Sequence, residues 1–318
     1  MIAGIDPKVD YAFKHVFGKE RHEAMLIDLI DAVRLRRPGT PTRGLQILNP
    51  FNDKETLDDK LSILDIKARD AAGNQFNVEM QMLARMFLRE RLIYYWSKFH
   101  QQQLREGQGY EELRPTILIC FINEITFPGI ADGVLLFELQ NREHAVVLTD
   151  QINLWMIELP KFTQTLEELS EPLDHWLYFL RHATELDAAN LPAPLDHNPL
   201  ILQAMEDLMK LSQTDLERER YEARLKAQRD DLTFRTWAKQ HAEQQLQQGL
   251  EKGRQEGRQE GRQEGHEQGE RESLNRFIHR FEERLGRPRT PEPELASKSV
   301  AQLQEIADHL EAELFSRP

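Results

Sequence analysis

The fold is decided by two strand-like stretches and the turn residues between them: Leu61-Ser-Ile-Leu-Asp-Ile-Lys-Ala68, Asp70-Ala-Ala-Gly-Asn74 and Gln75-Phe-Asn-Val-Glu-Met-Gln-Met82. Alternation of apolar and polar residues in the outer stretches predicts strands, and the middle one predicts a turn centred near Ala72. The sequence therefore predicts a β-hairpin.

Asp65 and Glu79 are the first candidates for a catalytic site. Both lie seven residues from the predicted turn centre, so the hairpin sets them nearly opposite each other, with Cβ atoms ~5 Å apart. Gln81 points to the same face as Glu79, because side chains alternate along a strand. A carboxylate among buried strand residues is costly unless it is paired or binds a metal ion. The same pattern is also typical of a solvated hairpin face, on which Lys67 and Gln81 complete a polar stripe.

The residues around the hairpin predict further regular elements. Apolar spacing predicts helices over residues 9–17, 21–36 and 85–106, and strands over residues 115–123, 133–139 and 145–158. This order predicts an α/β fold with a mixed central sheet flanked by helices. A helical C-terminal tail follows.

Three prolines within residues 190–199 predict a domain boundary. We expect one domain over residues 1–195 and three segments after it. These are a charged helical segment (196–248), a glycine repeat (249–270) and a small helical C-terminal segment (271–318).

The glycine repeat has a period of four, with glycines at 249, 253, 257, 261, 265 and 269. A single helix is disfavoured there, because each interior glycine costs about 1 kcal/mol relative to alanine and like charges recur at i,i+4. Two helices could instead approach along the glycine stripe, with the Arg row of one against the Glu row of the other. This interpretation predicts a homo-oligomer through residues 200–270; the alternative is a flexible linker.

Charge and composition restrict the function classes. The net charge of −13 argues against a strongly basic nucleic-acid binder, but residues 1–120 hold 18 basic and 17 acidic residues, against 3 and 13 in residues 121–200. The single cysteine, Cys120, lies in an apolar run and favours a reducing compartment. No stretch reads as a signal peptide or a membrane span, so we expect a cytoplasmic protein. No zinc cluster, phosphate-binding loop or hydrolase elbow is evident.

Several segments taken together resemble the recombination-promoting nuclease and putative transposase family, a branch of the PD-(D/E)XK nuclease superfamily. They are Asp10-Tyr-Ala-Phe-Lys-His-Val-Phe-Gly18, Leu64-Asp-Ile-Lys-Ala-Arg-Asp-Ala-Ala-Gly-Asn74, Asn77-Val-Glu-Met-Gln81, Arg91-Leu-Ile-Tyr-Tyr-Trp-Ser97 and Gly107-Gln-Gly-Tyr110. The resemblance is strong over residues 6–125 and looser to about residue 240. It implies a restriction-endonuclease-like core.

The resemblance also implies roles for individual residues. Asp65 and Glu79 match the family's metal-binding carboxylates, and Gln81 stands where most of the superfamily has lysine. Asp10 matches a position that often supplies a further carboxylate. With the backbone carbonyl of Met80, Asp65 and Glu79 would bind Mg²⁺ or Mn²⁺, which prefer oxygen ligands.

DNA is the expected partner. Lys67 on the hairpin, and Arg91 and Tyr94 on the following helix, are candidate DNA contacts, because cations neutralise phosphates and aromatic rings stack on bases. Core packing is the competing interpretation for the neighbouring Tyr95 and Trp96. The sequence thus predicts a metal-dependent DNA endonuclease linked to recombination or mobile elements. The alternative is an inactive nuclease fold that serves as an interaction protein and oligomerises through its tail.

Overall fold

The computed structural model of this 318-residue chain describes residues 4–48, 66–83 and 87–316. The described chain divides into two compact units, Met1–Thr233 and Phe234–Pro318. The first unit contains the sheet, and the second is helical.

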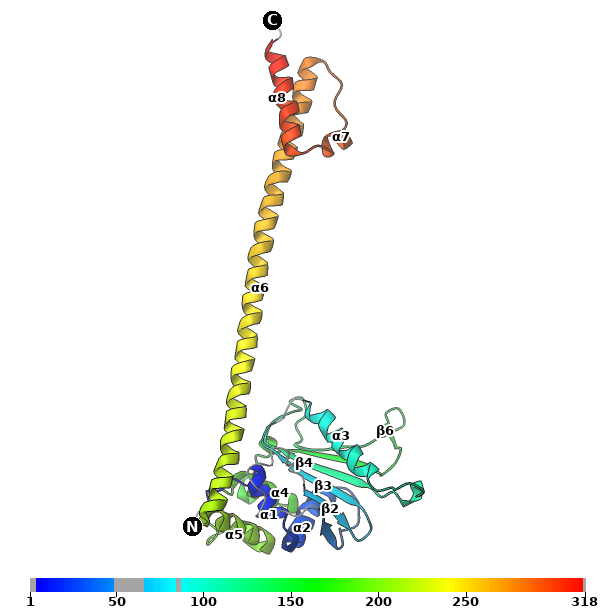
Figure 1. The fold of residues 1–318 in the computed structure, drawn as a ribbon, viewed down its shortest axis with the longest axis vertical. Helices are drawn as coiled ribbons and strands as arrows, with labels where there is room; N and C mark the ends of the chain where they lie inside the picture. Colours follow the sequence, from blue (N-terminus) through cyan, green and yellow to red (C-terminus); the bar gives the residue numbers. More distant parts are fainter. Residues whose placement is uncertain (1–3, 49–65, 84–86, 317–318) are drawn as a thin grey trace. The chain divides into compact units, whose positions relative to one another are not determined.

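A mixed six-stranded sheet forms the centre of the first unit, as predicted (Figure 1). Its strands are β1 (Leu45–Ile47), β2 (Ile66–Asp70), β3 (Gln75–Gln81), β4 (Thr116–Ile122), β8 (Ile152–Glu158) and β5 (Val134–Phe137), in this spatial order. β3, β4 and β8 run parallel, and the other neighbours pair antiparallel.

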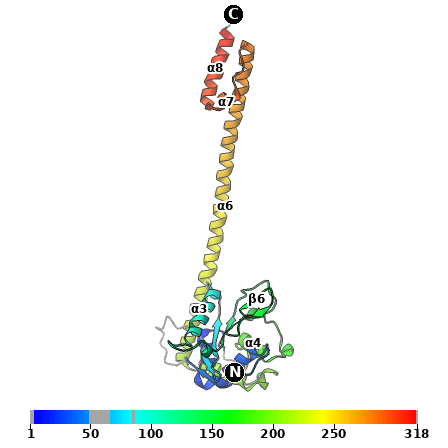
Figure 2. The same cartoon turned by 90° about the vertical axis from the view of Figure 1, so that its right-hand side faces the viewer.

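The predicted hairpin is confirmed in the part that the structure describes. Ile66 pairs with Val78 and Arg69 with Gln75, so the ladder is centred on residue 72. The strand expected over residues 145–158 is instead two strands. Its first part forms β7 (Val146–Val147), which pairs with β6 (Gln140–Asn141) in a small hairpin outside the main sheet (Figure 2).

One face of the sheet is covered by four helices. They are α1 (Asp10–Phe17), α2 (Glu23–Arg34), α4 (Pro172–His182) and α5 (Pro199–Gln213). Phe76, Val78 and Met80 of β3 point to this side, where they join the main hydrophobic core with aromatic residues such as Phe13 and Trp176. The predicted helices over residues 9–17 and 21–36 correspond to α1 and α2.

The other face is covered by α3 (Leu88–Gln101), which is shorter than the predicted helix over residues 85–106. Leu88 and Leu92 of α3 pack on Leu118, Cys120 and Ile122 of β4. One turn further along α3, the Trp96 indole Nε1 donates to the Thr116 carbonyl at 2.8 Å. The helix therefore crosses β4 from its carboxyl end toward its amino end.

α6 (Asp215–Leu285) is one continuous helix that includes the whole glycine repeat. Its last turns form a small core in the second unit with α7 (Glu292–Ala296) and α8 (Val300–Ser316), through Leu274, Ile278, Leu303 and Leu310. None of the helices in the described part of the chain combines the length and apolar character that crossing a membrane requires.

A buried ion pair fastens α5 to the start of α2. The His22 Nε2 lies 3.0 Å from the Asp207 Oδ2, both side chains are at most 2% exposed, and Lys210 also pairs with Asp207. Burial by itself raises the pKa of Asp207, but hydrogen bonds and charges from His22 and Lys210 outweigh this effect and lower the pKa to about 2.

Because the pKa of Asp207 is lower in the folded protein than in the unfolded chain, this pair stabilises the fold above about pH 4, and the contribution is lost as the pH falls toward 2. We predict that Asp207→Asn lowers the free energy of unfolding at pH 7 by up to about 2 kcal/mol and weakens its pH dependence between pH 4 and 2. Urea denaturation measures both. Glu206→Gln on the exposed side of α5 is the control; a pH dependence in Asp207→Asn equal to that of wild type would contradict the assignment.

Candidate active site

A row of polar side chains runs along the face of β3 that points away from the main core. Gln75, Asn77 and Glu79 are each 1% exposed, and Gln81 is half-buried at the end of the strand. Their burial follows from the central place of β3, which has a strand on either side. Polar groups in such a strand need hydrogen-bonding or ionic partners to offset the cost of leaving water.

Glu79 is held between two amide side chains of its own strand. The Asn77 Nδ2 donates to Oε1 at 3.1 Å, and the Gln81 Nε2 donates to Oε2 at 3.3 Å. Both contacts follow from strand geometry, because residues at i−2 and i+2 lie on the same face. The predicted site residues Glu79 and Gln81 are therefore brought into direct contact. Asn77 was not predicted; its place two residues before Glu79 was the available signal.

The Asn77 side chain has an unsatisfied acceptor. Its Oδ1 is buried and has no hydrogen-bond partner among the described residues. Leaving a buried acceptor without a donor costs about 1–3 kcal/mol. Asn77 and Glu79 lie on the same face of β3, and carboxylate and amide oxygens are ligand types that hard cations prefer.

The other predicted ligands have different positions. Asp65 lies outside the described residues. The Met80 side chain points into the main core and is 4% exposed. A ligand role for this residue therefore depends on its backbone carbonyl. Asp10 opens α1, and its Oδ1 accepts a hydrogen bond from the Tyr11 amide at 2.6 Å. Among the described residues, no group of three or more His, Cys, Asp or Glu side chains is arranged to hold a metal ion.

The three predicted DNA contacts lie on β2 and α3. Lys67 pairs with Asn77 in the ladder, and its ammonium lies 5.4 Å from the centroid of the Phe99 ring. The Arg91 guanidinium lies over the Tyr95 ring at 5.5 Å, and its Nη2 donates to the Tyr95 hydroxyl at 3.3 Å. Tyr94 is 61% exposed.

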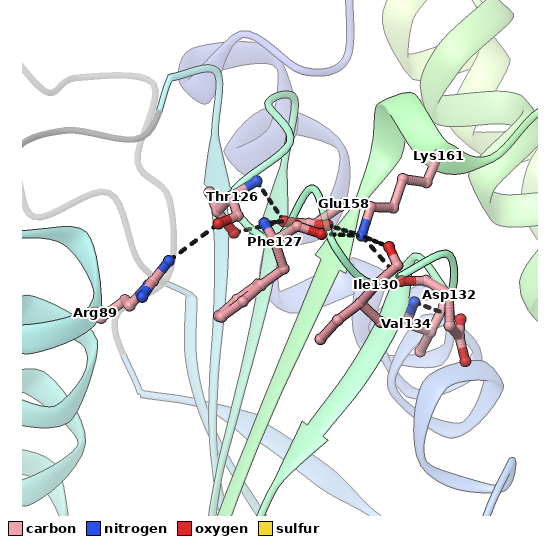
Figure 3. Close-up of polar contacts among 8 residues, drawn as sticks. All are labelled: Arg89, Thr126, Phe127, Ile130, Asp132, Val134, Glu158 and Lys161. Atoms are coloured by element: carbon pink, nitrogen blue, oxygen red, sulfur yellow. Dashed lines mark hydrogen bonds and ion pairs between the residues drawn. The ribbon is translucent and has the colours of Figure 1, made fainter.

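A buried carboxylate that the sequence analysis did not single out lies at the end of β8 (Figure 3). Glu158 is 1% exposed, and its Oε1 accepts from the Thr126 amide at 2.5 Å, the Thr126 hydroxyl at 2.5 Å and the Phe127 amide at 2.9 Å. The Lys161 Nζ lies 2.5 Å from Oε2. Burial by itself raises the pKa of Glu158, but the bonds from Lys161, Thr126 and Phe127 outweigh it, so the pKa is lowered.

Lys161 extends this cluster along the loop that follows β4. Its Nζ also donates to the carbonyls of Phe127, Ile130 and Asp132 (Figure 3). The start of α3 joins the same loop, because the Arg89 Nη2 donates to the Thr126 carbonyl at 3.0 Å and its guanidinium lies 4.4 Å from the Phe127 ring centroid.

Both oxygens of Glu158 are used in these contacts, so its role is to position the loop. This loop leaves β4 at the carboxyl end of the parallel strands, which is also the end at which Glu79 and Gln81 lie. The sequence signal was a glutamate that ends an apolar strand, with lysine three residues later.

Comparison with known proteins gives one finding. A family model described as PD-(D/E)XK nuclease family transposase matches residues 7–234. The search of curated proteins and the search of solved structures each gave no match.

We predict that Glu158→Gln destabilises the protein by about 3 kcal/mol, because it leaves the Lys161 ammonium buried without its counter-charge. Chemical denaturation measures the loss, and hydrogen exchange at the Thr126 and Phe127 amides should accelerate. Glu143→Gln, an exposed carboxylate near the β6–β7 turn, should change stability by less than about 0.5 kcal/mol. Equal stability of the two variants would show that the cluster does not hold the loop.

Proposed function

Since this chain belongs to the PD-(D/E)XK nuclease family transposases, we propose that it is a metal-dependent DNA endonuclease that acts in recombination or in the movement of mobile elements. The observation that carries the proposal is the buried Glu79, held by the amides of Asn77 and Gln81 on the central strand. Family membership supports a nuclease-type function; the metal, the endonucleolytic mode and the biological setting are parts of the proposal.

Asp65 and Glu79 are the proposed metal ligands, with the backbone carbonyl of Met80. The register of the described hairpin supports this pairing, because Ile66 lies opposite Val78, as the sequence requires if Asp65 is to face Glu79. The unpartnered Oδ1 of Asn77 adds a neutral oxygen to the set. Carboxylate, carbonyl and amide oxygens suit Mg²⁺ or Mn²⁺.

When bound, such a cation supplies Lewis acidity to a water molecule and to the phosphate. The side chains around it have separate tasks. Asn77 fixes the orientation of Glu79 through Oε1. Gln81 can orient the attacking water through its amide, although it brings no positive charge to the phosphate as a lysine would. Asp10 is proposed as a further carboxylate of the site.

DNA contacts are proposed for Lys67, Arg91 and Tyr94. Lys67 lies one strand away from the polar row of β3, so its charge is close to the proposed cleavage site. Arg91 and Tyr94 lie on α3, which covers the same face of the sheet.

Homo-oligomerisation is proposed through residues 200–270. The continuous α6 supports a helix there, and Leu246 and Leu250, at the start of the glycine stripe, are 65% and 67% exposed. Two chains paired along this helix would bring two sites to one DNA duplex, each cutting one strand. The alternative function is that of an inactive nuclease fold that acts as an interaction protein. It would form the same oligomer but would not cleave DNA.

Substitution of the two carboxylates tests the proposed site. We predict that Asp65→Asn and Glu79→Gln each reduce Mg²⁺-dependent cleavage of supercoiled plasmid by more than a hundred-fold, because each removes a charged ligand. Titration calorimetry with Mn²⁺ should show weaker binding in both variants. Glu143→Gln is the matched control. Wild-type cleavage in the two site variants would rule out the assignment, and an inactive wild type that still oligomerises would favour the interaction protein.

Alanine substitution of the glycine stripe tests the assembly. At Gly253, Gly257 and Gly261 an added Cβ meets nothing within the chain. The triple Gly→Ala variant should therefore be more helical, by about 1 kcal/mol per site, and still lose its oligomeric state if another helix lies against the stripe. Light scattering measures the mass, and Gln255, Gln259 and Gln263 changed to alanine serve as the control. An unchanged mass with a more stable helix would show that the stripe faces solvent.

A further inference from the structure

The outward side of α3 carries aromatic rings and cations in alternation. Arg91, Tyr94 and Lys98 are spaced three and four residues apart, so they share one face of the helix, and Phe87 is the N-cap residue that directly precedes the helix. Leu88 and Leu92 lie on another side of the helix and pack into the core against β4. We call the four residues the α3 stripe.

The two rings of the α3 stripe are unusually open to solvent. Phe87 is 66% exposed and Tyr94 is 61% exposed. They lie seven residues apart in the sequence, one at the N-cap of α3 and the other in its second turn. Single exposed aromatics are common on protein surfaces, but two beside the cations of one short helix offer two rings for stacking.

Phe87 is also held in an unfavourable backbone conformation. Its φ is 59° and its ψ is 33°, in the left-handed region that a bulky side chain rarely occupies. Such a conformation costs on the order of 1–3 kcal/mol and is found mainly at functional positions. The cost is not offset by burial, because the ring lies in solvent.

The charge around the rings selects the kind of partner. α3 carries Arg89, Arg91 and Lys98 against a single acidic residue, Glu90. Tyr95 holds the Arg91 guanidinium in place through the ring contact and hydrogen bond described above. Exposed rings between fixed cations complement a polyanion that presents aromatic faces, which is the chemistry of a nucleic-acid strand.

A paired duplex hides its base faces in the stack, so an aromatic ring on a convex helix cannot lie flat against them. Unpaired bases expose these faces and can stack on successive aromatic side chains. We propose that the α3 stripe binds a single-stranded segment of DNA by stacking unpaired bases on Phe87 and Tyr94, with Arg91 and Lys98 on the phosphates. The inference rests on the proposed function and deepens it: the substrate has an unpaired segment next to the cleavage site.

The position of the stripe fits this role. Phe87 follows Gln81, the last residue of the candidate β3 site, by only six residues. Arg89, two residues further on, donates to the loop that Glu158 and Lys161 hold. A strand bound along α3 therefore begins beside the carboxyl end of the parallel strands.

Binding in the presence of a chelator tests the proposal without any cleavage. Fluorescence anisotropy with a labelled twelve-residue oligo(dT), and with a labelled twelve-base-pair duplex, should show that Phe87→Ala and Tyr94→Ala each weaken single-strand binding on the order of ten-fold while changing duplex binding little. Tyr94→Phe should keep wild-type affinity, because the ring remains. An oligonucleotide carrying 2-aminopurine should be quenched by wild type and less so by the alanine variants.

Tyr110→Ala is the matched control, since Tyr110 is 84% exposed but lies in a separate short helix, Tyr110–Glu112. Circular dichroism checks that each variant is folded. Unchanged single-strand affinity in both alanine variants would overturn the proposal, as would an equal loss on duplex and single strand. Failure of the nuclease proposal is seen separately, as a wild-type protein that binds the oligonucleotide through Phe87 but cleaves no plasmid with Mg²⁺.

Discussion

Burial of β3 on both faces is the constraint on which the rest of the structure depends. Its position between β2 and β4, with helices on one side and α3 on the other, leaves only Gln81 partly open to solvent. Phe76, Val78 and Met80 satisfy this constraint by joining the main core. The opposite row cannot do so, because it contains a carboxylate. Glu79 is stable there only with donors beside it, and the strand supplies them from its own sequence at the two nearest positions on the same face.

Glu158 is a second buried carboxylate, and different partners offset the cost of its burial. Here the buried carboxylate pairs with the Lys161 ammonium through Oε2 and accepts from two backbone amides through Oε1. Glu79 accepts from the side-chain amides of Asn77 and Gln81, and the Asn77 Oδ1 has no hydrogen-bond donor among the described residues. The two carboxylates therefore have different surroundings: Glu158 is tied to a loop by a cation and by backbone donors, and Glu79 lies beside the side-chain amides of its own strand.

The hairpin and the residues on it could be predicted because their signals are local. Turn residues at 70–74 and alternation on both sides determine the register, and alternation alone places Gln81 beside Glu79. Signals that depend on distant partners could not be found in this way. β1 has only three residues, and the ties of Glu158 reach back more than thirty positions to Thr126. The predicted strand over residues 145–158 failed because two neighbouring apolar runs pair with different partners, β6 for the first and β4 and β5 for the second.

The position of Cys120 gives the molecule an internal reporter. This single thiol of the chain is fully buried on β4, directly opposite Glu79 in the parallel ladder. An alkylating reagent can reach its sulfur only when the strand pair or the covering α3 separates, so the labelling rate is proportional to the population of that opened form. The rate at which Cys120 is alkylated therefore reports how often the central sheet opens, and no probe has to be introduced at the site.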